Sequence, residues 1–344
     1  MHVFFVFGKG FVNSQSENVH YRDITATNYQ EIILQNNMSL PIHFAPLQGY
    51  TDDTFRRIHH QLAGGIDTYY TPFVRMEAGG VRSKDMRDIR PEFNEGVPVV
   101  PQIIVKSMKE FDYLVNIVEE KGYQRIDINM GCPFPMQAKH GRGSGLLAHT
   151  DIICEMAKRM ADIKHLQFSV KMRLGWENAD EWRPVLDMLN DTPLQQITLH
   201  PRIGTHQYKG SVNMDAFREF YGLCKHPLLY NGDITTLDDI RSIEQEFPKL
   251  AGIMIGRGLL ARPWLAAEYA AGTEWSDIKR RTLLHDMHDQ LKAHFETTAN
   301  SEAQVHTRLR LFWEYMEEEL GKKLYKKIMK AGNLKNYLAA VREV

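Results

Sequence analysis

The sequence predicts a (β/α)8 TIM barrel followed by a C-terminal all-helical domain. From about residue 41 to residue 272, short β-branched or apolar runs alternate with amphipathic stretches, which is typical of repeated βα units around a parallel sheet. Eight such runs can be placed, and this number favours a closed barrel. Polar or glycine-rich motifs follow run after run, as expected when one rim of a barrel carries the site. A doubly wound open sheet is the competing architecture.

Each expected strand is a short apolar or β-branched run. In chain order the strands are His43–Ala45, Ile66–Thr71, Val97–Ile103, Arg125–Ile128, Phe168–Met172, Gln196–Leu199, Pro227–Tyr230 and Gly252–Ile255. Helical patterns such as Lys109–Glu120, Ile152–Ile163 and Asp238–Glu246 lie between them. We expect the barrel domain to cover residues 38–272. Residues 1–37 show no clear periodicity and Met38 directly precedes the first strand, so we expect a leader outside the fold and a biological start at Met38.

The C-terminal part, residues 273–344, shows a different pattern. Beyond about Trp275 the glycines thin out and long helical patterns take over. The expected helices are Asp277–Thr297, Glu302–Glu319 and Leu324–Val344, with breaks near Asn300 and Gly321. From Trp275 to Val344 there are 13 Lys and Arg against 10 Asp and Glu, a net charge of +3, so the remainder carries −4 of the total of −1. The helical domain is therefore the more basic part.

Bulk composition excludes several classes of protein. With 344 residues and 43% hydrophobic composition, the chain is long enough for a barrel of roughly 250 residues and a smaller domain. A sequence pI near 7.0 gives no global basic field, so nucleic-acid binding must come from a local patch. No apolar run approaches the roughly 18 to 20 residues of a membrane span, and the Val3–Phe7 cluster is too short for a secretory signal. We expect a monomer without a membrane segment.

The chain has three cysteines, and their spacing argues against a metal or disulfide role. Cys132, Cys154 and Cys224 are widely separated, odd in number and without a Cys-x-x-Cys pair. Disulfides, zinc sites and iron–sulfur clusters all require closer or paired cysteines. We therefore expect no metal, and a reducing cytoplasm fits best.

The most specific motif is the segment Asp127–Pro133, which is followed by the glycine-rich segment Lys139–Leu147. Here a strand ends in a glycine-loosened turn that places the thiol of Cys132 on the barrel rim. A thiol with an ordinary pKa of roughly 8.5 is mostly protonated near neutral pH, which suits a general acid better than a preformed nucleophile. Taken alone, a single cysteine before proline is more often a buried packing residue.

The two segments together resemble the signature of the tRNA-dihydrouridine synthase family. Further matches follow in the same order along residues 41–272, and they are Ala45–Asp52, Pro101–Ile103, Val170–Trp176, His200–Arg202, Gln207–Gly210, Asn231–Ile234, Met254–Gly258 and Pro263–Trp264. The resemblance implies a flavin-dependent oxidoreductase that uses FMN and NADPH, or NADH, to reduce the C5–C6 double bond of a uridine in tRNA to 5,6-dihydrouridine. Cys132 would give the proton to C5 while reduced flavin delivers hydride to C6 from the opposite face.

The resemblance also implies further residues around the flavin and the base. Asn129 would lie beside the flavin and the target base, and Arg173 would face the base. Lys171 would lie at the N1–C2 edge of the flavin, where a cation stabilises the reduced anionic ring. Gln102 would bond to the pyrimidine edge of the ring, and His200 would cover the ring. The first strand's loop would contribute Pro46 and Leu47.

Two glycine-rich loops are expected to hold the FMN phosphate. Loops after the seventh and eighth strands supply backbone N–H groups for phosphate in many barrels, and the candidates at these positions are Asn231, Gly232, Asp233, Gly256 and Arg257. No Gly-x-Gly-x-x-Gly motif opens an early βαβ unit, so a tightly held dinucleotide is not expected. Reduced nicotinamide is expected to bind only transiently.

A uridine in tRNA must leave its stack to be reduced, so basic residues are needed near the barrel mouth. The candidates are Lys139 and Arg142 after the cysteine loop, and a stripe of Lys322, Lys326 and Lys330 in the helical tail. An ordinary solvated face is the alternative for this stripe. The acidic run Glu317–Glu319 is close in sequence and would repel phosphate, so only part of the tail can face RNA.

The chain departs from the family pattern after the sixth strand. Where the family commonly has His-Gly-Arg-Thr, this chain has His-Pro-Arg-Ile at residues 200–203. Pro201 removes a backbone donor and fixes φ, which changes any backbone contact at that position but not the side-chain role of His200. Two other functions remain in view: an FMN barrel acting on a small molecule, such as a dihydroorotate or ene reductase, and a non-catalytic RNA-binding protein.

Overall fold

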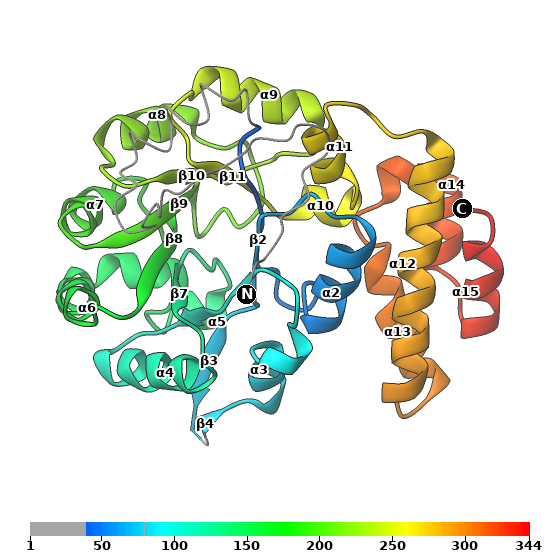
Figure 1. The fold of residues 1–344 in the computed structure, drawn as a ribbon, viewed down its shortest axis with the longest axis horizontal. Coiled ribbons are helices and arrows are strands. Elements are labelled where there is room, and N and C mark those ends of the chain that lie inside the picture. The colour runs from blue at the N-terminus through cyan, green and yellow to red at the C-terminus, as the bar shows by residue number, and fades with distance from the viewer. Residues whose placement is uncertain (1–38, 79) are drawn as a thin grey trace, which may run out of the picture.

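The computed structural model describes residues 39–78 and 80–344 (Figure 1). The barrel strands are β1 (Ile42–Phe44), β2 (Thr68–Tyr70), β5 (Val99–Val100), β6 (Gln102–Ile104), β7 (Arg125–Met130), β8 (Gln167–Gly175), β9 (Leu194–Ile203), β10 (Leu228–Tyr230) and β11 (Gly252–Ile255). All of these pair in parallel, from β6 through to β11, then to β1, β2 and β5. The expected leader, residues 1–37, lies outside the described residues.

The ring closes at Pro101. β5 pairs with β2 and β6 pairs with β7, and only Pro101 separates β5 from β6. Proline has no N–H to donate to a ladder, so this residue divides one strand into two short ones. Counted with β5 and β6 as one strand, the ring consists of the eight strands that the sequence predicted, and the (β/α)8 prediction is confirmed.

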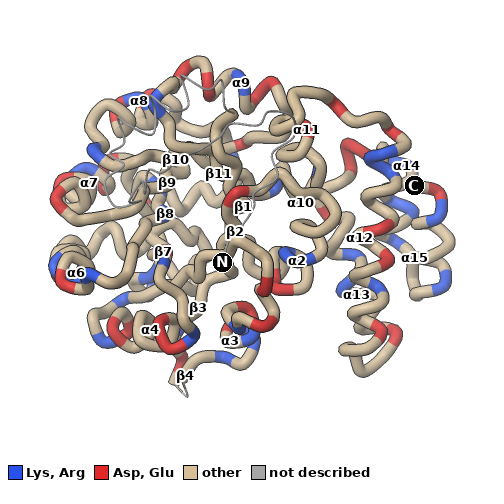
Figure 2. Tube along the Cα trace, viewed as in Figure 1, with Lys and Arg blue, Asp and Glu red and all other residues tan. Residues whose placement is uncertain are grey.

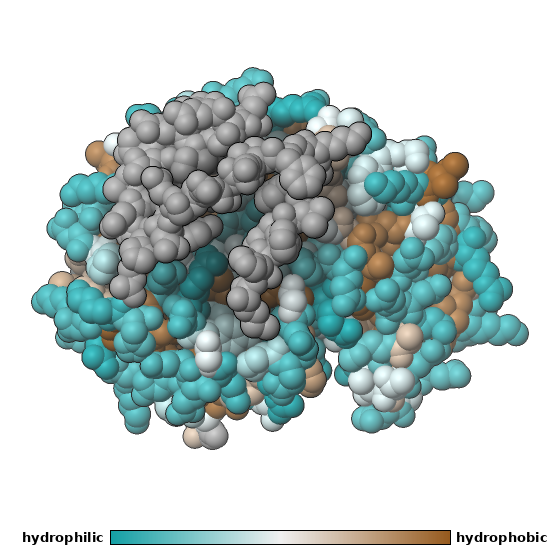
Figure 3. All heavy atoms as spheres, viewed as in Figure 1, coloured by the Kyte–Doolittle hydropathy of each residue, from teal (hydrophilic) through white to brown (hydrophobic). Residues whose placement is uncertain are grey.

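Helices cover the outside of the ring (Figure 1). They are α2 (Asp53–Leu62), α3 (Ser83–Asp88), α4 (Met108–Glu120), α6 (Thr150–Asp162), α7 (Trp182–Asn190), α8 (Met214–Leu223), α9 (Leu237–Glu246) and α11 (Leu265–Ala271). The short helices α5 (Pro135–Ala138) and α10 (Arg257–Ala261) lie at the rim, and the chain also has the 3-10 turns η1 (Pro91–Phe93) and η2 (Gly143–Ala148). Side chains cap several N-termini: Asp52 begins α2, Ser107 begins α4 and Thr236 begins α9. Figure 3 shows polar side chains over much of the visible outer surface of the described helices.

The alternation of residues along three adjacent strands determines what fills the barrel. On β7 the apolar residues Ile126, Ile128 and Met130 are fully buried in the main core, while Asp127 and Asn129 alternate with them. Side chains of successive strand residues point to opposite faces. Strands β8 and β9 alternate in the same way, so the interior of this part of the barrel is polar and leads up to the rim.

The structure adds a hairpin that the sequence analysis did not predict. β3 (Val74–Glu77) pairs in parallel with β6, and β4 (Gly80–Val81) pairs with β3 in antiparallel. The hairpin extends the barrel at the rim beside β6. It brings Arg75 and Arg82 to the cavity described below.

The tail consists of α12 (Asp277–Thr298), α13 (Glu302–Phe312), α14 (Glu317–Met329) and α15 (Leu334–Val341). The sequence-based bounds were wrong at two places. The expected helix Glu302–Glu319 ends at Phe312, and Leu324–Val344 is interrupted before Asn333, whose side chain caps α15. The expected break at Gly321 is present as a left-handed residue with φ 73° inside α14.

The tail packs on the barrel through α12, which lies along α2 (Figure 1). Thr54 Oγ1 lies 3.2 Å from His294 Nε2, and the rings of Tyr50 and Tyr315 meet edge to face at 5.3 Å. These contacts place the start of α14 beside the loop that follows β1. Within the described part of the chain, no helix has both the length and the apolar character needed to span a membrane.

Candidate active site

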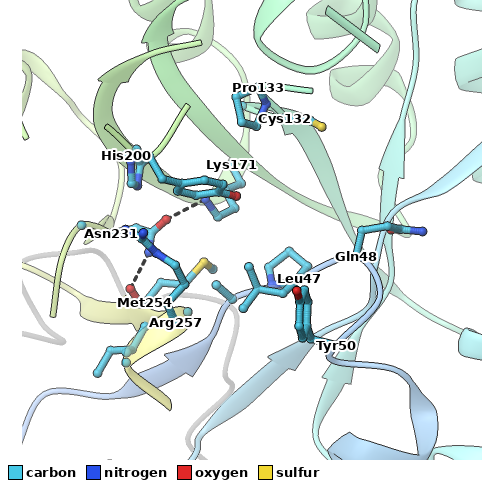
Figure 4. Close-up of a pocket in the computed structure, with 18 of the residues that line it drawn as sticks. Leu47, Gln48, Tyr50, Cys132, Pro133, Lys171, His200, Asn231, Met254 and Arg257 are labelled. Carbon is cyan, nitrogen blue, oxygen red and sulfur yellow. Dashed lines mark hydrogen bonds between the residues drawn. The ribbon is translucent and has the colours of Figure 1, made fainter. Parts of the chain in front are cut away.

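A cavity of about 1040 Å³ opens at the carboxyl ends of the barrel strands (Figure 4). A cavity of this size is at the upper end of ordinary ligand sites. Most of the predicted site residues line it, and they are Pro46, Leu47, Asn129, Cys132, Lys171, Arg173, His200, Asn231, Gly232, Asp233, Gly256 and Arg257. Because they lie on or after six different parallel strands, β1 and β7 to β11, the closure of the ring brings them together at one rim.

The loop that carries Cys132 is held by hydrogen bonds on both sides of the cysteine. Asn129 Oδ1 accepts from the N–H of Gly131 at 3.0 Å and from the N–H of Cys132 at 2.8 Å. The carbonyl oxygen of Cys132 accepts from Ser144 N at 3.1 Å and from Ser144 Oγ at 2.9 Å. A Cβ on Gly143 would lie 2.7 Å from Cys132 Cβ, and Gly143 has φ 59°, so only glycine fits there.

The environment of Cys132 favours the protonated thiol. Burial raises the pKa of Cys132, and this effect outweighs the hydrogen bond at Phe134 and the nearby cations Arg173 and Lys171, which act in the opposite direction. A thiol in an apolar, partly enclosed setting therefore keeps its proton at neutral pH. The group is suited to donating a proton to a substrate in the cavity.

Lys171 lies near the cysteine loop, on the neighbouring strand β8 (Figure 4). Its Nζ donates to Asn231 Oδ1 at 2.7 Å, and Asn231 Nδ2 donates to the carbonyl oxygen of Met254 at 2.7 Å. Burial, and then the proximity of Arg173, lowers the pKa of Lys171 to about 8. An anionic group beside this lysine would be stabilised by a cation that the protein already holds in place.

Tyr208 stands between two arginines at the mouth. Its ring centre lies 5.4 Å from Arg173 Cζ and 4.6 Å from Arg257 Cζ. Arg173 also donates to the carbonyl oxygen of Ile203 at 2.9 Å, and burial lowers its pKa to about 10. Cation–π contacts of this kind hold guanidinium groups at a fixed place on the rim.

His200 is neutral and its tautomer is fixed by a neighbour. Burial, followed by Arg173, lowers the pKa of His200 well below its ordinary value. Arg202 Nη1 lies 3.2 Å from His200 Nε2. Because arginine can only donate, Nε2 is the acceptor and Nδ1 carries the proton. The same arginine pairs with Asp233 and donates to the carbonyl oxygen of Gly210 at 2.6 Å. The loop around Pro201 thus keeps His200 at the cavity despite the departure from the family pattern.

The two glycine-rich loops expected to hold phosphate pack directly against each other. A Cβ on Gly258 would lie 2.0 Å from the carbonyl oxygen of Ile234, so the loop after β10 and the start of α10 can touch only because residue 258 is glycine. Gly256 begins α10 and no side chain caps this terminus. The first N–H groups of a helix lack partners within the helix, and Arg257 Nη2 and Asp233 Oδ1 meet at 3.0 Å beside them. These donors and this cation fit a phosphate group.

The structure keeps six predicted residues out of the cavity lining. Gln102 is fully buried beneath it, and its amide bonds to Asp127 and Asn129. Arg142 pairs with Glu110 at 2.5 Å and so braces the cysteine loop against α4. Lys139 is exposed. In the tail, Lys322 and Lys326 are exposed on α14, and Lys330 is exposed directly after it. Figure 2 shows both signs of charge along α14.

Sequence reasoning did not identify several residues that line the cavity. Arg75 and Arg82 come from the unpredicted hairpin and the turn after it. Phe134 and Met136 follow Cys132 and are 55% and 68% exposed, which is unusual for large apolar side chains. The tail contributes Tyr315, Glu318 and Glu319, and Arg262 of the barrel pairs with both glutamates. Two large apolar residues, at the second and fourth positions after the cysteine, were the available signal.

Comparisons with known proteins show the family of the chain. A family model described as dihydrouridine synthase (Dus) matches residues 43–343. The probable tRNA-dihydrouridine synthase 2 of Bacillus subtilis is 29% identical over 254 residues, 72% of this chain and 77% of that protein. The tRNA-dihydrouridine(16) synthase of Pseudomonas syringae pv. tomato is 29% identical over 247 residues, 70% of this chain and 77% of that protein.

Among solved structures, histamine dehydrogenase from Rhizobium sp. 4-9 is similar in fold. The match has a TM-score of 0.50 and 10% sequence identity, and it covers 72% of this chain and 48% of the other. At this identity the likeness concerns the barrel architecture alone. In the part of the chain that the structure describes, no group of three or more His, Cys, Asp or Glu side chains is arranged to hold a metal ion.

Proposed function

The chain belongs to the dihydrouridine synthase family, and from this premise we propose that it reduces the C5–C6 double bond of a uridine in tRNA. The product is 5,6-dihydrouridine, the bound cofactor is FMN, and NADPH or NADH is the transient reductant. The observation that carries the proposal is the pairing of a protonated thiol, Cys132, with the cation of Lys171 in one cavity large enough for a flavin and a base. We place the reaction in the cytoplasm, with the protein acting as a monomer, and the three unpaired cysteines support a reducing compartment.

The residues around the cavity fit a flavin nucleotide. Asn231, Gly232, Asp233, Gly256 and Arg257 would hold its phosphate at the two packed loops, where the uncapped start of α10 offers backbone donors. Lys171 and His200 would lie beside the ring, and Pro46 and Leu47 would pack against it. When bound, the flavin supplies the hydride that goes to C6 of uracil.

The protein's own chemical contribution is a proton and an oriented base. Cys132 Sγ holds the proton that passes to C5, and the burial that raises its pKa keeps that proton in place until the base arrives. Asn129 and Arg173, on the same rim, offer an amide and a guanidinium to the polar edge of an extruded uracil.

A direct test compares substrates. Purified protein is expected to oxidise NADPH faster with unmodified tRNA than with free uridine or orotate, and to form dihydrouridine in that tRNA. Equal stimulation by a free pyrimidine would instead favour a flavin barrel acting on small molecules. Mapping dihydrouridine in tRNA from cells with and without the gene then identifies the modified position.

Phe134 is expected to stack on a nucleobase next to the extruded uridine, because extrusion leaves the neighbouring base unstacked. Phe134→Ala is expected to raise the KM for tRNA by roughly 10-fold, since stacking contributes about 1 to 3 kcal/mol per base. The rate of flavin reduction by NADPH should not change. Leu223→Ala is the matched control because Leu223 is similarly exposed, at 53%, on α8. An equal KM for both variants would show that Phe134 does not contact RNA.

The tail lysines are expected to contact phosphates of the tRNA. Replacing Lys322, Lys326 and Lys330 with glutamine should weaken tRNA binding by roughly 10-fold and reduce the slope of log K against log salt by roughly 2 to 3. Fluorescence anisotropy with labelled tRNA at several salt concentrations measures both. Lys158→Gln with Lys164→Gln is the control, because these exposed lysines lie on and just after α6, away from the tail (Figure 1). An unchanged salt slope would show that the three lysines form an ordinary solvated face and do not contact the tRNA.

A further inference from the structure

We propose that Gln102 and Asp127 are positioning residues. With Asn129 they form a chain of hydrogen bonds, here called the relay, in which the donor and acceptor of each bond are fixed. The relay orients the backbone around Cys132 and so directs its thiol into the cavity. The relay runs from the barrel interior to the rim. Its consequence for catalysis rests on the proposed function, whereas its effect on the cysteine loop does not. None of the three residues acts on the substrate's reacting atoms through this relay.

Strand register brings the three side chains together. Gln102 of β6 is paired with Asp127 of β7, and Asn129 is two residues further along β7 and hence on the same face. Gln102 and Asp127 are fully buried and Asn129 is 7% exposed. The three side chains therefore form a column inside the barrel, with Asn129 at the top.

The lower end of the column sets the direction of the hydrogen bonds. Asp127 Oδ2 accepts from Gln102 Nε2 at 2.7 Å, and Asp127 Oδ1 accepts from Ser169 Oγ at 2.6 Å. Burial raises the pKa of Asp127 to about 6, so the group is mainly an ionised carboxylate, and an acceptor only, at neutral pH. Gln102 must therefore turn its nitrogen towards Asp127 and its oxygen towards Asn129.

The upper end demands the same direction. Gln102 Oε1 accepts from Asn129 Nδ2 at 2.7 Å. This turns Asn129 Oδ1 towards the loop, where it accepts from the N–H groups of Gly131 and Cys132. Backbone N–H groups can only donate. Reversing the two amides would place acceptor against acceptor at Asp127 and donor against donor at the loop.

The relay and Ser144 together fix the direction of the cysteine side chain. Asn129 holds the peptide group before Cys132, and Ser144 holds the carbonyl oxygen after it. With both neighbouring peptide groups held, the Cα–Cβ bond has one orientation. An ordinary role in satisfying buried polar groups would require only that each atom has a partner, whereas the relay requires Asn129 to donate to residue 102, so that its Oδ1 faces the loop.

Three variants separate these two roles. Gln102→Glu places a carboxyl group against Asp127, and at the alkaline pH used for alkylation, where both groups are ionised, the two repel each other. Asp127→Asn can still accept from Gln102 and can donate to Ser169. In the double variant Gln102→Glu with Asp127→Asn, the new asparagine donates to the new glutamate, whose other oxygen still accepts from Asn129. The double variant moves the charge by one residue. It reverses the lower hydrogen bond but keeps Asn129 donating to residue 102, which is the link that turns Asn129 Oδ1 towards the cysteine loop.

The test measures how fast iodoacetamide alkylates Cys132 in the full-length protein, quantified by peptide mass spectrometry. Cys154 of α6 in the same sample is the internal reference. Gln102→Glu is expected to speed alkylation of Cys132 by about 5-fold or more, because a loosened loop opens locally more often. Asp127→Asn and the double variant are expected to match the wild-type protein. Gln102→Glu should also lower kcat for dihydrouridine formation by about 100-fold, the loss expected for a misplaced thiol. Asp127→Asn should preserve kcat, and the double variant should restore it.

A double variant as reactive as Gln102→Glu, or a Gln102→Glu variant with wild-type reactivity, would overturn the relay. If Gln102→Glu does not fold, Asp127→Asn and the double variant decide, because a raised reactivity of Cys132 in either contradicts the proposed direction. Since alkylation needs no product, a wild-type protein that forms no dihydrouridine would refute the proposed function and leave the relay to be judged on its own readout.

Discussion

Cys132→Ala is expected to lower the rate of dihydrouridine formation by about 100- to 10,000-fold, the usual contribution of a positioned general acid. Burial holds the proton on the thiol, and alanine removes the proton donor while leaving Lys171 and the phosphate loops unchanged. The variant should therefore keep its flavin absorbance and its affinity for tRNA. Single-turnover oxidation of the reduced enzyme by tRNA, with the product identified by mass spectrometry, measures the loss.

The matched control is Cys154→Ala, since Cys154 is a partly buried cysteine on α6 outside the cavity. It should react at the wild-type rate. A Cys132→Ala enzyme with full activity would assign the proton to another group, and solvent entering the cavity would then be the natural source. Loss of flavin from this variant would instead indicate a structural role for the cysteine.

Much of the candidate site was predictable because strand alternation can be recognised in the sequence. Lys171 lies between the apolar residues Val170 and Met172, so the pattern places it inside the barrel. His200 follows Leu199 in the same way. A charged residue inside a barrel, near the carboxyl end of a strand, lies at the rim where parallel-barrel sites form. The resemblance to a family then assigned roles to positions that the pattern had already selected.

Height along the barrel axis was not predictable from that pattern. Alternation places Gln102 inside, but its register with Asp127 sets it one layer below Asn129 and out of the cavity lining. Register depends on how strands pair, and one strand's sequence does not fix its partner's offset. Arg142 shows the same limit in a loop, because its partner Glu110 lies 32 residues away on α4.

The β3–β4 hairpin was missed for a related reason. Val74–Glu77 alternates apolar and polar residues, but over only four residues, which is the shortest run in which strand periodicity can be recognised. It is a strand because β6 offers unpaired backbone groups beyond Pro101, where β2 no longer reaches. Pairing supplied by a neighbour, rather than local propensity, forms this element.

Lys171 is expected to make the stability of the protein depend on pH in a defined direction. Its pKa is about 8 in the folded chain against 10.5 in the absence of burial. Between these values the unfolded chain binds the proton and the folded chain does not, so the free energy of unfolding should rise as pH increases from about 8 to 10.5. After allowance for partial solvent access, the rise attributable to Lys171 is roughly 1 to 3 kcal/mol.

Urea unfolding of the flavin-free wild-type protein and of Lys171→Met, repeated from pH 7.5 to pH 10, isolates this contribution as the change in their difference. Loss of the bond to Asn231 destabilises the variant equally at every pH and so cancels. Lys164→Met is the matched control, because it makes the same replacement at an exposed position just after α6 and outside the cavity. A difference for Lys171→Met that changes with pH no more than the difference for Lys164→Met would mean that folding does not disfavour the charged lysine. Lys171 would then not be a cation placed in advance for an anionic ring. Such a buried cation lowers the stability of the flavin-free protein and is stabilised only when the anionic ring binds.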